Sequence, residues 1–391
     1  RKAIVHLISS TMSFRRAFGN IFHGNDGTAG EKPPLLSIGT LQWGTTWLDE
    51  KMINTRGGCI SESTARDIFQ RASKANIQLW DTAEGYGGGT SEKRLGRLLK
   101  ERRDKQAESA GTTATSEEED GIIIMTKFLP VPWRYSHGCF ESAVRASCKR
   151  LGVDRIPVYL MHSPVHWRSL EFWVEAAAIC KRKGLIEALG LSNCNAEQVE
   201  RAVKAGKEYG VDVVLNQVHY SLLCYNAPEL QEMQEMCRKH DVAIVGFSPL
   251  GQGLLTNKMT EEAFEGNRPA KMMKIGWDDM GDLRTTLKQV SDEHNTTMAQ
   301  VAIKWCANHD VIPLVGCRSL SQLEDSLGSI SETWKLSDAN MAALDKVALR
   351  HSTFRSPEWR RGIFVGLFGV IMVVCRTLDL LGYGMVESAS R

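Results

Sequence analysis

Hydrophobic and polar residues alternate along the middle of the chain in two recurring patterns. Short aliphatic runs, typical of strands buried on both faces, are each followed by a longer stretch whose apolar residues lie three and four positions apart, typical of an amphipathic helix. Residues 170–180 show the helical pattern, and Asn195 stands where it can cap a second helix. The pattern predicts strands at residues 35–41, 77–81, 122–127, 158–162, 188–192, 213–217, 243–248 and 311–316.

This repeated alternation favours one α/β architecture. Eight strand–helix units of this kind are typical of a closed (β/α)8 TIM barrel, whose helices form an outer ring. The alternative with the same alternation is an open, doubly wound sheet with helices on both faces. We expect the barrel to occupy residues 33–350, between an N-terminal extension at 1–32 and a C-terminal extension at 351–391.

Polar residues interrupt the apolar runs at the C-terminal ends of the expected strands. In a TIM barrel these ends carry the active site, because the loops that follow all strands open on one face. The residues that stand there are Asp81, with Tyr86 in the following loop, Lys127, His162, Ser192, Asn193, Gln217, Ser248, Gly316 and Arg318. A barrel without a site has no need of polar side chains at all of these places.

Four of these residues are of the types that protonate a carbonyl oxygen. The hydroxyl of Tyr86 is a weak acid, and an ammonium group such as that of Lys127 lowers its pKa. A buried ammonium group needs a carboxylate, which Asp81 supplies, and His162 can orient a carbonyl by donating a hydrogen bond. Since the set contains no nucleophile and no metal, the hydride for a reduction has to come from a cofactor.

Each residue taken singly has a simpler interpretation. Asp81 could cap the next turn, Lys127 could end a solvated strand, and His162 could be a core histidine. The argument for a site therefore depends on their joint placement at consecutive strand ends.

Motifs of several other protein classes are absent. The glycines at 85–89 do not follow the G-x-G-x-x-G spacing, and neither a nucleotide P-loop nor G-x-S-x-G occurs. His162 and His166 have the spacing of a metal pair on a helix, but Pro164 between them disfavours that helix. We expect no metal site.

Composition adds limits on the class of protein. The 391 residues are 42% hydrophobic and 24% charged, which is ordinary globular composition. The formal net charge of +2 gives no support for binding nucleic acid through phosphate contacts. The ten cysteines lie scattered in apolar segments without a C-x-x-C pair, as expected for reduced thiols in an intracellular compartment.

The N-terminal extension has two interpretations. The sequence begins with Arg1 rather than Met, which indicates a fragment. Residues 1–25 are basic, rich in hydroxyl groups and free of acidic residues, as in an organelle transit peptide or a basic tail. A transit peptide would place the protein in a plastid, and a plain tail would leave it in the cytoplasm.

Two further segments differ from the barrel. The apolar run at 363–375 is flanked by arginines and is shorter than the ~20 residues of a spanning helix, so an interfacial membrane anchor and a helix packed on the barrel both fit. Residues 104–120 are acidic and contain no large apolar residue, which predicts a solvated, flexible insertion.

In combination, the strand-end segments resemble the aldo-keto reductases, which are NAD(P)H-dependent carbonyl reductases built on a (β/α)8 barrel. The resemblance covers about residues 35–347, and the segment 129–134 is most similar to the branch found in plant and algal plastids. The matching motifs are Gly39-Thr-Leu-Gln-Trp-Gly44, Asp81-Thr-Ala-Glu-Gly-Tyr86-Gly, Met125-Thr-Lys127-Phe, Leu160-Met-His162, Gly190-Leu-Ser-Asn193, Asn216-Gln217-Val-His-Tyr220, Phe247-Ser-Pro-Leu-Gly-Gln-Gly-Leu254 and Ile312-Pro-Leu-Val-Gly-Cys-Arg318.

The resemblance implies a role for each matching residue. Tyr86 would donate the proton, Lys127 and Asp81 would tune it, and His162 would orient the carbonyl. The nicotinamide carboxamide would be held by Ser192, Asn193 and Gln217, with Tyr220 stacked on the ring. The other residues assigned to the cofactor are Gly39, Thr40, Leu41 and Asp81, then Ser248, Leu250, Gly251 and Gln252 for the pyrophosphate, and Gly316, Arg318, Ser319, Gln322 and Asp325 for the adenosine end.

Arg318 decides which dinucleotide is expected. A guanidinium group facing a 2′-phosphate forms a bidentate, charge-assisted pair, so this residue favours NADPH. The family often has Glu-Asn where this chain has Asp325-Ser326, so the amide of that asparagine is missing from the adenine contact.

The implied function is NADPH-dependent reduction of aldehydes or ketones to alcohols. Trp43, Trp133 and Trp167 are expected near the cavity mouth, where they favour an apolar or aromatic carbonyl compound unless they merely pack on the rim. The alternative is an NADP(H)-binding, redox-sensing subunit of a membrane protein, since family members serve as channel β-subunits and residues 363–375 could tether one. A third hypothesis is a metal-dependent hydrolase that uses His162 and His166.

Overall fold

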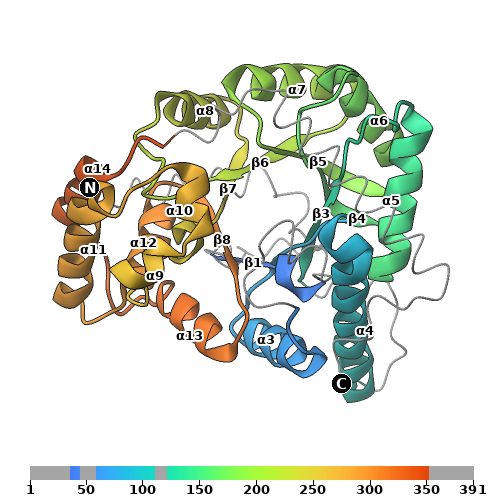
Figure 1. The fold of residues 1–391 in the computed structure, drawn as a ribbon. Helices are drawn as coiled ribbons and strands as arrows, with labels where there is room; N and C mark the ends of the chain where they lie inside the picture. Colours follow the sequence, from blue (N-terminus) through green and yellow to red (C-terminus); the bar gives the residue numbers. More distant parts are fainter. Residues whose placement is uncertain (1–35, 45–58, 111–120, 352–391) are drawn as a thin grey trace.

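The computed structural model describes residues 36–44, 59–110 and 121–351. Within them, parallel strands follow one another in chain order and close into a barrel, because β1 pairs with both β2 and β8 (Figure 1). The closed ring confirms the (β/α)8 barrel and excludes the open sheet. The strands are β1 (Ser37–Gly39), β2 (Leu79–Asp81), β3 (Ile123–Phe128), β4 (Ile156–Met161), β5 (Ile186–Ser192), β6 (Val213–His219), β7 (Ala243–Phe247) and β8 (Val311–Gly316).

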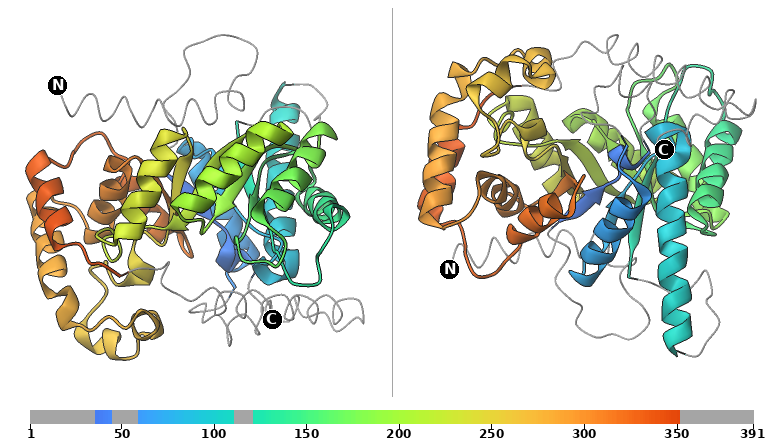
Figure 2. Two further views of the ribbon diagram at one scale, coloured as in Figure 1. Left: turned by 90° about the horizontal axis from the view of Figure 1, so that it is seen from above. Right: turned by 60° about the horizontal axis from the view of Figure 1, so that its bottom comes forward.

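Helices surround the barrel, and the long helix α4 projects beyond it (Figure 2). The helices are α3 (Glu62–Lys74), α4 (Thr90–Ala110), α5 (His137–Leu151), α6 (Leu170–Arg182), α7 (Ala196–Tyr209), α8 (Pro228–Lys239), α9 (Glu261–Glu265), α10 (Arg268–Met273), α11 (Gly281–Glu293), α12 (Met298–Asn308), α13 (Leu320–Gly328) and α14 (Asp338–Val347). Short 3-10 turns are η1 (Leu41–Trp43), η2 (Tyr86–Gly89), η3 (Gly251–Gly253) and η4 (Asp278–Met280).

The helix starts follow the capping rules that the sequence suggested. The side chain of Asn195 accepts a hydrogen bond from the Gln198 N–H, and the Gln198 side-chain oxygen accepts one from the Asn195 N–H. This capping box satisfies two donors that a helix start leaves free, and it confirms Asn195 as the cap of α7.

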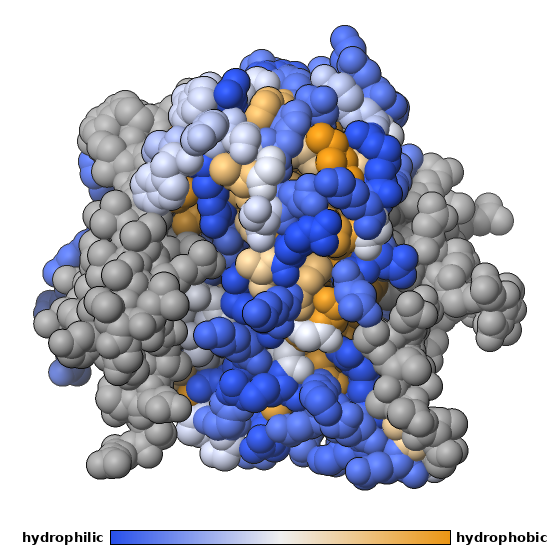
Figure 3. Space-filling model, turned by 90° about the vertical axis from the view of Figure 1, so that its right-hand side faces the viewer, coloured by the Kyte–Doolittle hydropathy of each residue, from blue (hydrophilic) through white to orange (hydrophobic). Residues whose placement is uncertain are grey.

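Apolar side chains form two layers. Residues of the strands that point inward fill the barrel, among them Met125, Leu160 and Val245. Outward-pointing residues such as Tyr159 pack against the apolar faces of the surrounding helices. The outer face over α4, α5 and α6 is largely hydrophilic, with small apolar patches (Figure 3), as expected for amphipathic helices.

Most strands begin or end one or two residues away from the predicted bounds, and β1 and β7 show a physical reason. β1 is only three residues long, because the chain turns into η1 directly after Thr40. β7 ends at Phe247, because Ser248 takes a positive φ of 56°, which is incompatible with a strand.

The acidic insertion was predicted too long. Residues 104–110 continue helix α4 to Ala110, so the helix extends into this segment despite its lack of large apolar side chains. Such a polar continuation is supported by local pairs such as Lys100 Nζ to Asp104 Oδ2 at 2.7 Å. The remainder, residues 111–120, lies outside the described residues.

The predictions for the two extensions also fall outside the described residues, since they concern residues 1–35 and 352–391. None of the helices in the described part of the chain is long and apolar enough to cross a membrane. The nine cysteines in that part are free thiols.

Candidate active site

Asp81, Tyr86, Lys127 and His162 lie together at the C-terminal face of the barrel. Asp81 ends β2, Lys127 lies near the end of β3, and His162 directly follows β4. Tyr86 begins η2, in the loop between β2 and α4. Parallel pairing of the neighbouring strands therefore brings these four residues to one edge.

Lys127 is the centre of this group. Its side chain is fully buried, and Nζ donates to Asp81 Oδ1 at 2.6 Å, to the Thr82 carbonyl at 2.8 Å and to the Tyr86 hydroxyl at 3.0 Å. Asp81 Oδ1 also accepts from Gln217 Nε2 at 2.7 Å. Three donors on the ammonium group thus find three acceptors, and the buried ion pair has the extra hydrogen bonds that such a pair requires.

Burial and pairing act against each other on this ion pair. Burial lowers the pKa of Lys127, but Asp81 and then Tyr86 outweigh it, so the lysine pKa is raised and the group stays an ammonium. Burial also raises the pKa of Asp81, against the opposing effects of Lys127 and Gln217. The two N–H donors on Oδ1 favour the carboxylate form.

The pKa of Tyr86 corrects one expectation. We expected Lys127 to lower it, but burial raises it further than Lys127 lowers it, and Asp81 adds to the increase. At neutral pH Tyr86 is therefore a neutral phenol that carries a proton.

His162 faces Tyr86 and is neutral. The two ring centroids lie 6.0 Å apart at an interplanar angle of 78°. Burial, with a smaller effect from Lys127, lowers the pKa of His162 to about 3. Its Nδ1 has no hydrogen-bond partner in the described part of the chain, so the imidazole has a polar atom left for another molecule.

The residues expected at the nicotinamide lie at the same face. Ser192 ends β5, and Asn193 follows with a positive φ of 59° and donates from Nδ2 to Ser192 Oγ and to the His162 carbonyl. Thr40 lies between Gly39 and Leu41, directly after β1. Its hydroxyl donates to the Asp81 carbonyl oxygen at 2.8 Å. These contacts join Thr40 to Asp81, and Asn193 to Ser192 and His162.

Tyr220 is not where the assignment requires it. Its side chain is fully buried, its ring stacks on Trp305 of α12 with centroids 5.6 Å apart, and its hydroxyl accepts from Gln234 Nε2. It points outward because side chains alternate along β6, where Gln217 points inward. Tyr220 is therefore a core residue between barrel and helices, and it cannot stack on a ligand in the barrel mouth.

Phe247 and His219 are the residues that the sequence analysis missed at this position. Phe247 ends β7 and packs against the inner layer of the barrel, partly exposed. His219, its partner in strand pairing, lies with its ring centroid 5.6 Å from that of Phe247 and has an unpartnered Nδ1 among the described residues. The alternation along β6 could have found His219, because it lies two positions after Gln217.

The residues expected at the pyrophosphate form the turn after β7. Ser248, Gly251 and Gln252 have positive φ angles of 56°, 54° and 56°. Leu250 packs on the core beside them, and Gln252 is exposed. The turn presents backbone at the barrel mouth, beside Phe247.

The residues expected at the adenosine end surround the start of α13. Gly316 is exposed, and Ser319 caps the helix by accepting from the Gln322 N–H. The Gln322 side chain accepts from the Arg318 N–H at 2.8 Å. Asp325 is already engaged, because its Oδ1 accepts from Thr297 at 2.7 Å and from Gln300 at 3.1 Å.

Only two of the three tryptophans stand at the rim. Trp133 is 46% and Trp167 60% exposed, and Trp167 Nε1 donates to the Pro132 carbonyl. Trp43 is fully buried and packs edge-on against Trp80 at 5.7 Å, so its expected place at the cavity mouth is wrong.

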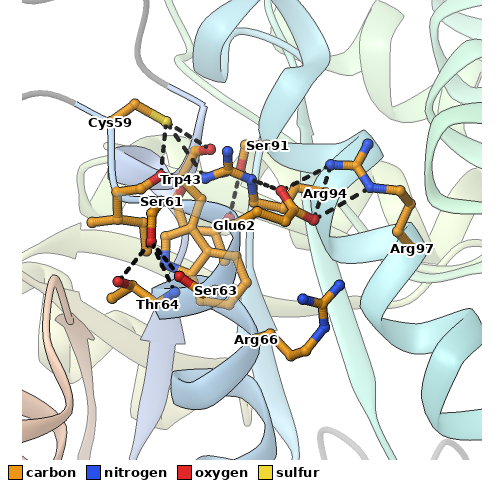
Figure 4. Close-up of polar contacts among 12 residues, drawn as sticks. Trp43, Cys59, Ser61, Glu62, Ser63, Thr64, Arg66, Ser91, Arg94 and Arg97 are labelled. Carbon is orange, nitrogen blue, oxygen red and sulfur yellow. Dashed lines mark hydrogen bonds and ion pairs between the residues drawn. The ribbon is translucent and has the colours of Figure 1, made fainter. Parts of the chain in front are cut away.

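A network of polar contacts supports the loop that carries Trp43 (Figure 4). Arg94 of α4 donates to the Ile60 carbonyl at 2.8 Å and pairs with Glu62 at 2.9 Å, and Glu62 also pairs with Arg97 at 3.0 Å. Cys59 Sγ lies 3.2 Å from the Trp43 carbonyl. The network fastens the chain after β1 to α4, whose first residue follows η2.

Both ring nitrogens of His166 lie near backbone groups of the described residues. Its Nδ1 accepts from the Arg168 N–H at 2.9 Å, and its Nε2 lies 3.3 Å from the Val131 carbonyl. No group of three or more potential metal ligands occurs among the residues that the structure describes.

The fold is a (β/α)8 barrel, and comparison with known proteins identifies its family as one of oxidoreductases. The model of the Aldo/keto reductase family matches residues 35–349, so the chain belongs to this family.

Two relatives and two solved structures show how far the similarity extends. Chloroplastic pyridoxal reductase of Arabidopsis thaliana is 29% identical, with 80% of this chain and 82% of the relative covered. An NADP(+) aldo-keto reductase of Schizosaccharomyces pombe is 28% identical, with 73% and 82% covered.

Among solved structures, a thermostable aldo-keto reductase in complex with epalrestat matches with a TM-score of 0.61 and 24% identity, over 83% of this chain and 98% of that chain. A silkworm aldo-keto reductase complexed with NADPH matches with a TM-score of 0.61 and 20% identity, over 85% and 90%. At these identities the two structures show the shared fold.

Proposed function

We propose that the protein reduces aldehyde or ketone carbonyls to alcohols with NADPH. The observation that carries the proposal is the contact of the Lys127 ammonium group with both Asp81 and the Tyr86 hydroxyl, beside a neutral His162. This arrangement holds a proton next to a site with no nucleophile, which suits proton transfer to a carbonyl oxygen.

NADPH supplies the hydride when it is bound. His162 donates a hydrogen bond that polarises and orients the carbonyl. Tyr86 delivers the proton from its hydroxyl to the oxygen, and the nearby Lys127 ammonium group stabilises the phenolate that this leaves. Asp81 keeps Lys127 charged and fixed in place.

Several features fit a dinucleotide at the barrel mouth. The nicotinamide end would meet Gly39, Thr40, Leu41, Asp81, Ser192, Asn193 and Gln217, with Phe247 in place of Tyr220 as the ring that faces it. The diphosphate would lie along Ser248, Leu250, Gly251 and Gln252, and the adenosine end along Gly316, Arg318, Ser319, Gln322 and Asp325. The partly exposed Phe247 and the unpartnered Nδ1 of neighbouring His219 support this placement.

Arg318 supports the choice of NADPH over NADH. Among the described residues its guanidinium group forms no ion pair within 4.0 Å, while its backbone N–H donates to the Gln322 side chain at the start of α13. An arginine at a helix start without a carboxylate partner suits the 2′-phosphate, since two of the phosphate oxygens can accept parallel N–H bonds from one guanidinium group.

The test is NADPH oxidation by the full chain with a panel of aromatic and aliphatic aldehydes that includes pyridoxal, the substrate named for the Arabidopsis relative. We expect multiple turnovers in the wild type and a fall of about 10²–10⁴-fold in Tyr86→Phe, with NADPH binding retained. Equal turnover in the two proteins would remove Tyr86 from the mechanism.

A second function is favoured by one relative. A probable voltage-gated potassium channel subunit beta of Arabidopsis thaliana is 24% identical over 75% of this chain. A redox-sensing subunit of this type would bind NADPH tightly without multiple turnovers, so the same assay separates the two functions.

For the location, we propose a plastid, with residues 1–32 as the transit segment. The name of the chloroplastic relative supports this. A fluorescent fusion that carries residues 1–32 should enter plastids, and a cytoplasmic fusion would favour the basic-tail interpretation.

A further inference from the structure

Glu84 is a buried carboxylate to which the proposed chemistry gives no role. Its side chain is fully enclosed, two positions before Tyr86 in the loop between β2 and η2. One carboxylate oxygen, Oε1, accepts from the Leu129 N–H at 2.7 Å and from Arg134 Nη1, and Oε2 accepts from Arg134 Nη2 at 3.1 Å. The carboxylate is therefore held on both oxygens.

Arg134 is fixed from the other side of this contact. Its side chain is 16% exposed, and its Nη1 also donates to the Leu129 carbonyl at 3.1 Å. The guanidinium carbon lies 5.0 Å from the centre of the Phe128 ring. Residues 128–134, at the end of β3, thus wrap around the Glu84 carboxylate.

The residues that make these contacts are close in sequence to the proposed catalytic residues. Glu84 lies two residues before Tyr86, and Leu129 lies two residues after Lys127. The bond between Glu84 and Leu129 therefore ties the loop that carries the tyrosine to the strand that carries the lysine. It does so beside the 3.0 Å contact between Tyr86 and Lys127.

We propose that Glu84 and Arg134 form a positioning pair that holds the Tyr86 hydroxyl against Lys127 and in line with the carbonyl. The proposal rests on the proposed function of Tyr86. A buried ion pair gives little net stability compared with apolar packing, so its value here is fixed geometry. Proton transfer depends strongly on that geometry, since a displacement of about 1 Å can cost about 100-fold in rate.

The chain offers a matched control for this pair. Glu92 and Arg150 form a second buried carboxylate–arginine pair, with side chains 0% and 11% exposed and a 2.5 Å contact. Glu92 belongs to α4 and also accepts from Thr126 Oγ1 at 2.7 Å, so it joins α4 to α5 and β3. Its partner Arg150 lies beside Gly89 at the end of η2, but Glu92 itself makes no hydrogen bond to residues 82–86 among those that the structure describes. It has the burial and charge of Glu84 but lacks its place between the two catalytic residues.

The experiment compares Glu84→Gln with Glu92→Gln in the full chain. For Glu84→Gln we expect kcat for the aldehyde to fall at least about tenfold, with the Kd for NADPH within about twofold of the wild type. Glu92→Gln should keep kcat for the folded protein while losing stability. In the Glu84→Asp variant the shorter carboxylate should restore kcat only in part.

Equal kcat values for Glu84→Gln and the wild type, or equal losses in the two variants, would overturn the proposal in favour of a purely structural pair. A wild type without turnover would instead refute the proposed function. In that case hydrogen–deuterium exchange tests the positioning role. The amides of residues 82–86 should exchange faster in Glu84→Gln than in the wild type, and at the wild-type rate in Glu92→Gln. Unaltered exchange there in Glu84→Gln would overturn the positioning role whatever the activity.

Discussion

The Nζ atom of Lys127 lies 3.0 Å from the hydroxyl oxygen of Tyr86, in a site where the lysine side chain is fully buried. The ammonium group is in hydrogen-bond contact with the proposed proton donor, yet burial still keeps the tyrosine pKa above its ordinary value. Tyr86 therefore keeps its proton at neutral pH, and in the proposed mechanism Lys127 acts mainly by stabilising the phenolate that forms as the proton leaves.

Replacing Lys127 by methionine should damage both stability and rate. The variant keeps an unbranched side chain of similar length but leaves the Asp81 carboxylate buried with only Gln217 to donate to it. Breaking a buried pair by removing one partner costs about 3–5 kcal/mol in the free energy of unfolding. Urea unfolding measures the stability, and turnover of an aldehyde should fall at least about 100-fold.

The double variant Lys127→Met with Asp81→Asn serves as its control. It should recover part of the lost stability, because the uncompensated charge is gone, and none of the lost rate. Unchanged stability of the single variant would show that Asp81 and Lys127 do not depend on each other.

His219 should make stability depend on pH. Burial, with a smaller effect from His351, lowers the pKa of His219 from 6.5 to about 4. The unfolded chain therefore takes up the proton first as the pH falls below 6.5, so the free energy of unfolding decreases between pH 6.5 and 4. At pH 5 this group alone accounts for about 2 kcal/mol.

Replacing His219 by glutamine removes the titrating group at similar size. The difference between the unfolding free energies at pH 7.5 and pH 5 should shrink by about 2 kcal/mol relative to the wild type. His162, whose pKa is lowered to about 3, should keep part of the dependence in place. An identical pH dependence in the variant would mean that His219 is not neutral in the fold.

The barrel and most of the site could be predicted from the sequence because both follow from local patterns. Strand periodicity located all the strands, and polar residues at their C-terminal ends located Asp81, Lys127 and His162 at one face. These inferences need only the order of the strands in the chain and the fact that the C-terminal ends of parallel strands lie on the same face of a barrel.

The remainder depends on contacts that sequence spacing does not specify. The alternation along β6, which assigns Gln217 to the inside, already indicates that Tyr220 points outward, but its stacking on Trp305 depends on packing that the sequence does not specify. The pairing of Glu84 with Arg134 spans fifty positions, so no local pattern in the sequence indicates it. The pKa of Tyr86 depends on how deeply its hydroxyl is buried, and the sequence alone does not give that burial.

Replacing Arg318 by alanine should change cofactor preference. Loss of a guanidinium–phosphate contact costs about 1.5–3 kcal/mol, which is about 10–150-fold in Kd. We expect the Kd for NADPH to rise by this factor and the Kd for NADH to stay within about twofold. Fluorescence titration with the two cofactors measures both, and equal losses would show that Arg318 does not contact the 2′-phosphate.

Gly87, which directly follows the proposed proton donor, should not tolerate a side chain. It has a positive φ of 57°, and a Cβ atom built there would lie 1.3 Å from the carbonyl oxygen of Gly44. Because the obstacle is backbone, no change of side-chain rotamer can relieve it. Gly87→Ala should therefore displace η2 together with Tyr86, and reduce both the free energy of unfolding, by about 4 kcal/mol or more, and kcat.

Gly152, the C-terminal cap of α5, is the control, because a substitution there has the backbone strain without the clash. Its φ of 66° is similar, but a Cβ atom there meets nothing within 4 Å. Gly152→Ala should cost only about 1–2 kcal/mol, the price of a left-handed conformation, and should leave kcat unchanged. If urea unfolding gave the two variants the same loss, the close approach of Gly87 to Gly44 would not be what fixes the loop that carries Tyr86.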